Sequence, residues 1–284
     1  MTDLTGRICL VTGATRGIGR ATAEALAKMG AQVLLHGRDS ASVGAVVREM
    51  VRHGNVAGVV GDFSSLAAVR KLATEVAARH PRLDVLVNNA GAGALRREAT
   101  ADGFERQFGV NHLAPFLLTN LLLERLKASK AARIVTVSSM AHRSGKLDFD
   151  DLNWEKRKYS GLQAYGATKL ANILFTTELA RRLDGSKVTA NCLHPGVVAT
   201  NIFNTMGFGG RLVSVLFRPF MLSPAKGALT SVYLASSPEV AKVTGKFFDK
   251  CRETATAPAA QDAAAAQRLW EISERLTGLA SGAK

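Results

Sequence analysis

The sequence of 284 residues has little cysteine and no long apolar run. Its three cysteines, Cys9, Cys192 and Cys251, are too few and too far apart to predict a disulfide framework or a cluster of metal ligands. No uninterrupted apolar run reaches the roughly 18 residues that a membrane-spanning helix needs. No basic segment followed by apolar residues opens the sequence, so no secretory signal is predicted. We therefore expect a soluble, cytoplasmic protein in a reducing compartment.

The sequence also lacks repeats, low-complexity segments and a Pro/Ser-rich linker, which predicts one domain over residues 1–284. Short apolar runs alternate with segments of helical length, a pattern typical of an α/β fold with a parallel sheet and helices on both faces. Seven strands are predicted, at Ile8–Thr12, Gln32–His36, Val56–Val60, Val85–Asn88, Arg133–Val137, Val188–Leu193 and Lys246–Phe248. The predicted helices are Gly19–Met29, Ser42–Arg52, Ala68–Arg79, Phe116–Lys127, Ala167–Leu183 and, in a C-terminal tail of about residues 255–284, Gln267–Leu276.

The charge is strongly positive, with 37 Lys and Arg against 23 Asp and Glu, a net charge of +14. The basic residues stand in short, scattered groups such as Arg96-Arg97 and Arg181-Arg182. No helix-turn-helix, zinc or RNA-recognition motif accompanies them. We interpret the excess as a solvated basic face with no nucleic-acid partner. The alternative is a membrane- or nucleic-acid-associated scaffold, whose binding would be sensitive to salt.

A glycine-rich loop joins the first predicted strand to the first helix. Gly13, Gly17 and Gly19 permit a tight turn and let the backbone approach a pyrophosphate at the helix N-terminus. The alternative at this point is a plain strand-to-helix turn, since three glycines alone are weak evidence. The spacing, G-x-x-x-G-x-G, differs from the common G-x-G-x-x-G of dinucleotide-binding folds.

With five further motifs in order, this loop resembles the short-chain dehydrogenase/reductase family. The motifs are Asn88-Asn89-Ala90-Gly91, Asn111, Ser138-Ser139, Tyr165-Gly166-Ala167-Thr168-Lys169, and Pro195-Gly196 with Thr200. The resemblance implies a doubly wound Rossmann-type fold and a catalytic group of Asn111, Ser139, Tyr165 and Lys169, without a metal. It implies cofactor contacts from Gly13, Thr15, Arg16, Gly17, Ile18, Gly19, Arg38, Asp62, Phe63, Asn89, Ala90, Gly91, Tyr165, Lys169, Pro195, Gly196, Val198 and Thr200.

The end of the second predicted strand bears on the choice of cofactor. NAD-dependent members of the family place an acid there to bind the ribose hydroxyls. Here Gly37 stands at that position and Arg38 follows it, while Arg16 lies in the glycine loop. Two guanidinium groups suit the additional phosphate of NADP(H), so we predict NADP(H) in preference to NAD(H). The alternative is that Arg38 is an exposed loop charge and Asp39 is the ribose acid.

The proposed catalytic residues have complementary chemistry. Tyr165 and Lys169 are four apart on one predicted helix, so both side chains face the same way. An ammonium group beside a phenol stabilises the phenolate and brings its pKa toward the working range. Ser139, rather than Ser138, aligns with the family serine and would hydrogen-bond the substrate oxygen, leaving Ser138 to bond locally. Asn111, expected within a helix, would hold a water molecule that links Lys169 to solvent.

Twenty-six positions separate Ser139 from Tyr165, about twice the number in compact family members. The polar insertion Leu147–Leu162 resembles the retinol dehydrogenase-like branch, which includes the oxidoreductase domain of the WW-domain oxidoreductase. Further matches are Asn111-His112-Leu113, Ser138-Ser139-Met140-Ala141-His142, the run from Lys169 to Phe175, Leu193-His194-Pro195-Gly196-Val197-Val198 and Arg268-Leu269-Trp270-Glu271. Many branch members reach membranes through an apolar N-terminal segment that is not found here, which puts a membrane-delivered retinoid substrate in doubt.

The residues after Pro195-Gly196 are rich in large apolar side chains and coincide with the family's substrate lid, at about residues 201–223. The alternative for this segment is an oligomer contact or a core helix. The sequence thus predicts an NADP(H)-dependent oxidoreductase that interconverts an apolar aldehyde or ketone, similar to retinal, a steroid or a long-chain aldehyde, and its alcohol. The competing hypothesis is a dinucleotide-sensing protein with little turnover. A homo-oligomer and weak contact with a membrane surface remain open. His142, His194, Trp154 and Trp270 are expected to pack or hydrogen-bond.

Overall fold

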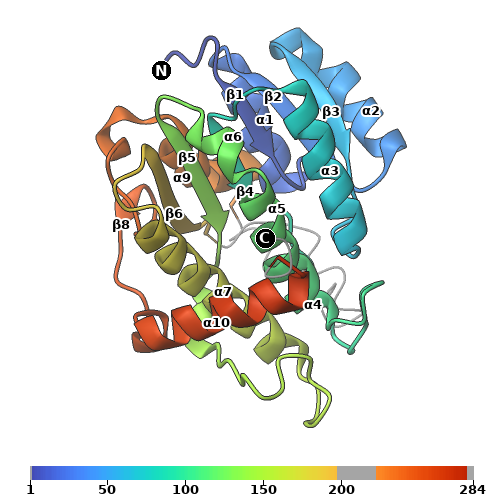
Figure 1. Cartoon of the computed structure of the whole chain (residues 1–284). Coiled ribbons are helices and arrows are strands. Elements are labelled where there is room, and N and C mark those ends of the chain that lie inside the picture. The colour runs from blue at the N-terminus through green and yellow to red at the C-terminus, as the bar shows by residue number, and fades with distance from the viewer. Residues whose placement is uncertain (1, 197–221, 280–284) are drawn as a thin grey trace.

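Parallel strands run through the middle of the molecule in a twisted sheet with helices on both sides (Figure 1). The computed structural model describes residues 2–196 and 222–279. In these residues the sheet has eight strands in the order β3-β2-β1-β4-β5-β6-β7-β8. The strands are β1 (Ile8–Val11), β2 (Gln32–Gly37), β3 (Val56–Val60), β4 (Val85–Asn88), β5 (Ala132–Val137), β6 (Val188–His194), β7 (Phe247–Asp249) and β8 (Arg252–Glu253).

The strand order reverses between β1 and β4. From β1 the chain moves outward to β2 and β3, returns to β4 on the other side of β1, and continues through β5, β6 and β7, all in parallel. In open α/β sheets ligands bind beyond the carboxyl ends of the strands at such a reversal. The predicted doubly wound α/β fold is confirmed, and its topology directs attention to the segments that follow β1, β4 and β5.

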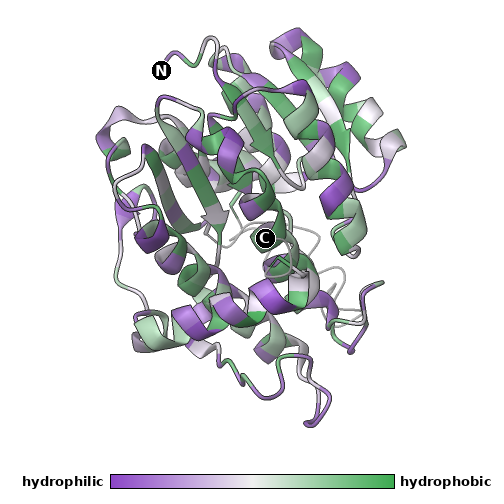
Figure 2. Ribbon diagram, viewed as in Figure 1, coloured by the Kyte–Doolittle hydropathy of each residue, from purple (hydrophilic) through white to green (hydrophobic). Residues whose placement is uncertain are grey.

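Helices cover both faces of the sheet. They are α1 (Gly17–Lys28), α2 (Ser40–Met50), α3 (Leu66–Arg79), α4 (Arg106–Phe108), α5 (Ala114–Leu121), α6 (Leu123–Lys127), α7 (Gly161–Arg182), α9 (Pro224–Ser236) and α10 (Ala263–Thr277). Buried side chains of α1, α2 and α9 form one core, and those of α3, α5 and α7 form another. Hydrophobic residues fill the strands between these layers, as Figure 2 shows. Strands covered on both faces are apolar throughout, and that is why their positions were predictable.

The strand count is the main correction to the predicted sheet. β8 pairs antiparallel with β7 and adds an eighth strand to the seven predicted. The chain reverses at Lys250 and Cys251, whose φ angles are +49° and +61°. Glycine or asparagine is the usual signal for a turn with positive φ, and neither is present here.

Several helix boundaries also differ from the prediction. The helix expected over Phe116–Lys127 is divided at Leu122 into α5 and α6, and α7 begins at Gly161, six residues before its predicted start. The C-terminal helix α10 begins at Ala263, because the side chain of Asp262 accepts a hydrogen bond from the Ala265 N–H and caps it.

Asn111 lies in a π-helical turn, Gly109–Leu113, between α4 and α5, whereas a regular helix was expected. Most of the predicted lid, together with Val198 and Thr200, lies outside the described residues. Among the residues that are described, none of the helices is long and apolar enough to cross a membrane.

Candidate active site

The glycine-rich loop between β1 and α1 has a shape that only glycine permits. Gly13 and Gly17 have φ angles of +63° and +58°. A Cβ atom on Gly13 would lie 2.8 Å from the Cα of Ala90, and one on Gly19 would lie 2.3 Å from the amide nitrogen of Asn89. The loop therefore packs closely against the segment that follows β4.

Polar contacts hold these two segments together. The Asn89 side chain donates to the backbone oxygens of Thr12, at 2.7 Å, and Gly13, at 3.2 Å. In return the Thr12 hydroxyl oxygen accepts the N–H groups of Asn89 and Ala90 at 2.9 and 3.0 Å. Asn89 and Ala90 therefore hold the glycine-rich loop in place through hydrogen bonds, in addition to any contact with a cofactor.

The N-terminus of α1 is left without a side-chain cap. Its N-cap residue, Arg16, makes no capping hydrogen bond. By contrast, Asp39 caps α2 and Ser65 caps α3 through their side-chain oxygens. An uncapped helix start beneath a glycine-rich loop presents backbone N–H groups and the positive end of the helix dipole. These features fit the pyrophosphate of a dinucleotide.

The end of β2 lies beside this loop. A Cβ atom on Gly37 would be 2.5 Å from the Thr15 methyl group, so Gly37 and Thr15 pack against each other. Arg38 follows Gly37 and Arg16 follows Thr15, so the two arginines lie on neighbouring segments. Both arginines are exposed, and within the described ranges neither forms an ion pair. The Asp39 carboxylate accepts the Ser42 N–H at 2.8 Å and has a lowered pKa because of that contact. The acid that the alternative hypothesis assigns to the ribose is thus already engaged as a helix cap.

His36 is a residue of this region that the sequence analysis left without a role. Its Nδ1 accepts the Gly13 N–H at 3.2 Å, so its Nε2 carries the hydrogen and donates to the Gly61 oxygen at 2.8 Å. Burial lowers its pKa to about 4 and keeps the ring neutral. The ring stacks on Phe63, which is buried, while Asp62 is exposed. His36 therefore connects the glycine loop to the end of β3.

The tyrosine and lysine of α7 reach the same place, as predicted. The Lys169 side chain is buried, donates to the Val137 oxygen at 3.1 Å, and has its nitrogen 5.4 Å from the centre of the Tyr165 ring. Burial lowers the pKa of Lys169 to about 8. Burial also raises the pKa of Tyr165 to about 12, although a hydrogen bond with the Ser139 side chain opposes the rise. Ser139, Tyr165 and Lys169 are thus brought together.

Asn111 approaches this group from the π-helical turn. Its side chain pairs with the backbone of Ala92, donating to the oxygen at 2.9 Å and accepting the N–H at 2.7 Å, and it also donates to the Thr168 hydroxyl at 3.2 Å. A Cβ atom on Gly91 would lie 3.5 Å from the Asn111 oxygen and 3.9 Å from the Lys169 nitrogen. The two polar groups therefore border one small space at Gly91.

Two expectations about neighbouring residues have different outcomes. Ser138 does not bond locally; its hydroxyl donates to the Lys169 oxygen at 2.7 Å and ties β5 to α7. His142 is a buried hydrogen-bonding residue, as expected, and lies between the Ser139 oxygen and the Ala257 N–H. Pro195 and Gly196 follow β6, and Gly196 has a φ angle of +82°.

The insertion Leu147–Leu162 contributes a second set of residues that the motifs did not indicate. Tyr159 donates to the buried carboxylate of Glu105 at 2.9 Å and accepts from the Gln107 amide at 2.8 Å. Burial and the charge of Glu105 raise the pKa of Tyr159. Gln107 also donates to the Gly161 oxygen at 3.0 Å, at the start of α7. The only sequence signal for this network was the unusual length of the insertion.

Comparison with known proteins agrees with this geometry. The family model described as short chain dehydrogenase matches residues 7–207. Human retinol dehydrogenase 14 is 47% identical over 294 aligned residues, which cover 96% of this chain and 87% of that protein. A solved but uncharacterized protein from Mycobacterium paratuberculosis has a TM-score of 0.82 and 38% identity, over 98% of this chain and 96% of that one. Pseudomonas aeruginosa RhlG, solved as an active-site complex with NADP, has a TM-score of 0.70 and 26% identity, over 87% and 95%.

The order of the motifs, the fold and these matches lead to one assignment. The chain belongs to the short-chain dehydrogenase/reductase family of oxidoreductases, which bind NAD(P), and within it to the retinol dehydrogenase-like branch.

Proposed function

We propose that this oxidoreductase uses NADP(H) to interconvert an apolar aldehyde or ketone and the corresponding alcohol, with Tyr165 as the acid and base. The single observation that carries the proposal is the meeting of Tyr165, Lys169 and Ser139 at the carboxyl ends of β4 and β5. Lys169 is buried and Tyr165 is half-buried beside it. Their pKa values move apart, that of Lys169 down from 10.5 to about 8 and that of Tyr165 up from 10.0 to about 12, and such a perturbed pair is typical of a functional site.

When bound, the nicotinamide supplies the hydride that adds to the carbonyl carbon. Ser139 donates a hydrogen bond to the carbonyl oxygen, on which negative charge develops. Tyr165 then gives its proton to that oxygen, and oxidation of the alcohol runs through the same steps in reverse. The charge of Lys169 favours the phenolate left on Tyr165, because an ammonium group about 5 Å from the ring lies in a water-poor site where its field is weakly screened.

A proton must return to Tyr165 after each reduction. Lys169 is enclosed, and its nitrogen and the Asn111 oxygen border the space at Gly91. We propose that a water molecule in this space passes protons between Lys169 and solvent. Asn111 is well suited to hold it in place, because its side chain is fixed by both backbone groups of Ala92.

The preference for NADP(H) rests on charge at the end of β2. Arg16 and Arg38 are exposed on adjacent segments, and Gly37 replaces the acid that would repel a 2′-phosphate. A guanidinium group can pair with phosphate through two parallel hydrogen bonds. The capping role of Asp39 further supports this proposal over a ribose contact from that residue.

An apolar substrate is supported by the side chains at the start of α7 and after β4. Leu162 lies one helical turn before Tyr165 and is 66% exposed, and Leu95 is 48% exposed. A Cβ atom on Gly161 would lie 3.0 Å from the Cα of Leu95, so the two leucines come from touching segments. The names of the relatives as retinol dehydrogenases agree with such a substrate.

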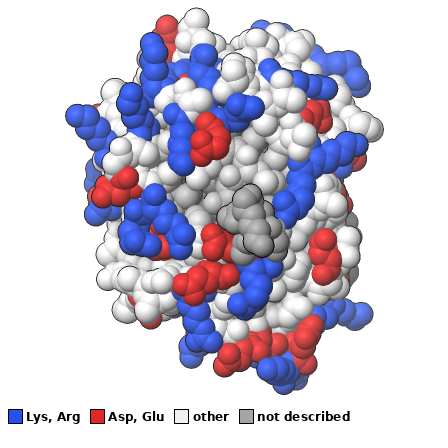
Figure 3. All heavy atoms as spheres, in the orientation of Figure 1, with Lys and Arg blue, Asp and Glu red and all other residues white. Residues whose placement is uncertain are grey.

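The basic excess is proposed to be solvated surface. On the face in Figure 3, lysine and arginine side chains occur in several groups with acidic side chains among them. Many arginines of the described residues form ion pairs, such as Arg97 with Glu155 and Arg268 with Asp150. This mixed pattern favours a small-molecule substrate over a nucleic-acid partner.

The test replaces Tyr165 with phenylalanine, which removes the proton donor but keeps the ring. We expect Tyr165→Phe to lower kcat at least about 100-fold and to change the Kd of NADPH by no more than about twofold. The matched control is Tyr233→Phe on α9. The Tyr233 hydroxyl donates to the Glu239 carboxylate at 2.9 Å and is not hydrogen-bonded to Ser139, Tyr165 or Lys169. A Tyr165→Phe variant with more than about a tenth of the wild-type rate would refute the assigned role. Tight NADPH binding without turnover in the wild type would favour the sensing hypothesis.

A further inference from the structure

His112, the residue after Asn111 in the π-helical turn, is enclosed by aromatic rings. It is 1% exposed, stacks on Phe108 with ring centres 5.2 Å apart, and meets the edge of Phe175 at 6.2 Å. Burial lowers its pKa to about 3, so the ring is neutral near pH 7. The proposed reaction gives this residue no role.

One hydrogen bond orients the ring, and it comes from the far end of the sequence. The His112 Nε2 lies 2.8 Å from the hydroxyl oxygen of Ser273 on α10. The Ser273 hydroxyl has one hydrogen, which it donates to the Leu269 oxygen at 2.7 Å. Ser273 therefore accepts from His112, and the hydrogen of the neutral ring is on Nε2.

The π-helical turn Gly109–Leu113 has an irregular hydrogen-bond pattern that a contact from another helix can stabilise. The Ala114 N–H bonds to the Gly109 oxygen, five residues back, instead of making the regular helical bond to the fourth residue back. A π-helical turn is rare and is frequently found at functional sites, where the surrounding structure holds it in place. Figure 1 shows α10 crossing α7, which it contacts, and α10 also contacts α5 and the π-helical turn.

Packing reinforces the hydrogen bond. Trp270 of α10 meets Phe116 edge-on, with ring centres 4.9 Å apart, and stacks on Phe175 at 5.9 Å. The Arg182 guanidinium lies over the indole ring, 4.3 Å from its centre. The helix is therefore fixed relative to α5 and α7, so Ser273 is a rigid support for His112.

We propose that α10 positions Asn111 through the Ser273–His112 hydrogen bond. Ser273 and His112 are therefore positioning residues for the reaction. The inference rests on the role of Asn111 in the proposed function. A displaced turn moves the Asn111 oxygen away from the space at Gly91 and interrupts proton return to Lys169. Hydride transfer geometry and cofactor contacts are made by other segments, so the effect falls on kcat.

Two substitutions of His112 separate hydrogen bonding from packing. His112→Phe keeps an aromatic ring and loses the N–H, whereas His112→Gln loses the ring and keeps an amide N–H at a similar distance from the backbone. The proposal predicts that His112→Phe lowers kcat about tenfold or more, since small displacements at a reacting site have large effects, and that His112→Gln retains more activity than His112→Phe. The reverse order would show that packing alone matters and would overturn the proposal.

Ser273→Ala is the milder variant, and Thr277→Val is its control. The Thr277 hydroxyl is buried one turn further along α10 and bonds to the Ser273 oxygen within the helix. We expect Ser273→Ala to lower kcat with an unchanged KM for NADPH, and Thr277→Val to leave both unchanged. Thermal unfolding of each variant checks that the fold is retained. Equal kcat values for the two variants would overturn the proposal.

Hydrogen exchange provides a measure that does not depend on turnover. Loss of one buried hydrogen bond should speed amide exchange of Gly109–Leu113 roughly fivefold in Ser273→Ala but not in Thr277→Val. Unchanged exchange in Ser273→Ala overturns the inference even if the enzyme is active. If the wild type is inactive, the proposed function fails, and the exchange result still decides whether α10 holds the turn.

Discussion

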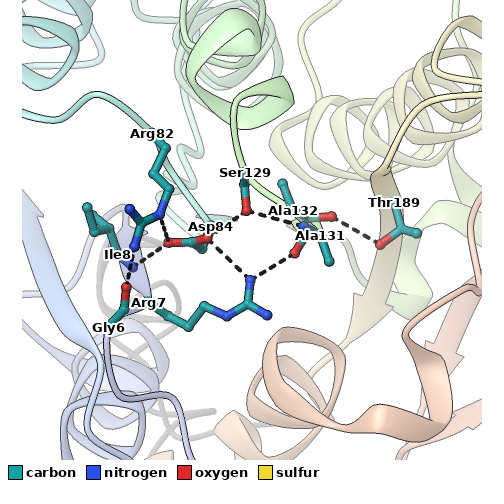
Figure 4. Close-up of polar contacts among 9 residues, drawn as sticks. All are labelled: Gly6, Arg7, Ile8, Arg82, Asp84, Ser129, Ala131, Ala132 and Thr189. Atoms are coloured by element: carbon teal, nitrogen blue, oxygen red, sulfur yellow. Dashed lines mark hydrogen bonds and ion pairs between the residues drawn. The ribbon is translucent and has the colours of Figure 1, made fainter.

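Asp84 is predicted to be a major source of stability at the amino ends of the central strands. Its side chain, 3% exposed, accepts hydrogen bonds from the Ile8 N–H at 2.8 Å and the Ser129 hydroxyl at 2.6 Å (Figure 4). It also forms ion pairs of 3.3 Å with Arg7 and Arg82. Asp84 thereby joins β1, β4 and the segment before β5.

The loss of stability in Asp84→Ala can be worked out from the hydrogen-bond donors that lose their acceptor. In Asp84→Ala the N–H of Ile8 and the hydroxyl of Ser129 lose their buried acceptor, at about 1–3 kcal/mol each. Arg7 and Arg82 are 39% and 43% exposed, so water can solvate them and their ion pairs add about 1 kcal/mol at most. We expect a loss of about 3–5 kcal/mol in the free energy of unfolding, or a fall in Tm of roughly 10 °C for a chain of this size.

The loss should also depend on pH. Burial alone would raise the pKa of Asp84, but hydrogen bonds from Ser129 and Ile8 and the charge of Arg82 together lower it below 3.8. A carboxyl group with a lowered pKa in the folded state stabilises the protein at neutral pH, and that contribution is lost as the pH falls through the folded-state value. The difference between wild type and Asp84→Ala is therefore largest near pH 7 and shrinks below about pH 4.

Thermal and urea unfolding, followed by circular dichroism, measure this effect. The matched control is Asp150→Ala, which removes an exposed aspartate whose ion pair with Arg268 has 83% and 55% exposed side chains. We expect that control to change stability by no more than about 0.5 kcal/mol. An Asp84→Ala variant within about 1 kcal/mol of wild type at pH 7 would refute the reasoning from buried, unpaired donors.

Three further predictions concern the site. Gly13→Ala should abolish cofactor binding and destabilise the fold, because the φ angle of Gly13 is positive and a Cβ atom there would meet Ala90. Gly91→Ala, by contrast, should fold normally and lower kcat by filling the space beside Asn111. Isothermal titration and steady-state kinetics distinguish the two variants, and an NADPH affinity of Gly13→Ala equal to that of the wild type would contradict the first expectation. Arg38→Ala should raise the Kd of NADPH about tenfold or more and that of NADH little, and equal losses would show that Arg38 does not bind the 2′-phosphate. In the cofactor-free protein, ultraviolet titration should show no more than one of the three tyrosines ionised by about pH 10, because burial raises the pKa values of Tyr159 and Tyr165 well above their usual range; an earlier transition that Tyr165→Phe removes would contradict the raised pKa of Tyr165.

Much of the fold was predictable because buried parallel strands are apolar throughout. The run at Ile8–Val11 is wholly apolar and buried, and the runs at Val85–Asn88 and Val188–His194 are nearly all buried. β8 was not predictable, since Lys250 and Cys251 adopt a turn that sequence preferences disfavour. The start of α7 was missed as well, because Gly161 begins the helix only where it packs on Ala94.

The candidate site divides in a similar way. Residues of local motifs, such as Tyr165 with Lys169, were predictable because helical spacing alone places them on one face. Residues that support these motifs through tertiary contacts were not predictable. The partners His112 and Ser273 are 161 residues apart, and the network of Glu105 and Tyr159 spans 54. No periodicity connects such pairs, so only the tertiary structure can identify them.

The π-helical turn is a further feature without a sequence signal. The apolar pattern around Asn111 is compatible with a regular helix, whereas the π-helical turn is held by Ala92, Thr168 and Ser273, which hydrogen-bond to Asn111 and His112 from distant parts of the sequence. Local propensity therefore indicated a helix at this position, and packing determined which kind of helix forms.

The most direct test of the central claim is the loss of nicotinamide absorbance when purified protein is mixed with NADPH and a set of apolar aldehydes and ketones. The account predicts turnover that is faster with NADPH than with NADH, increases with the apolar size of the substrate, and disappears in Tyr165→Phe. Turnover that persists in Tyr165→Phe, or an absence of turnover with every aldehyde and ketone despite tight NADPH binding, would contradict it.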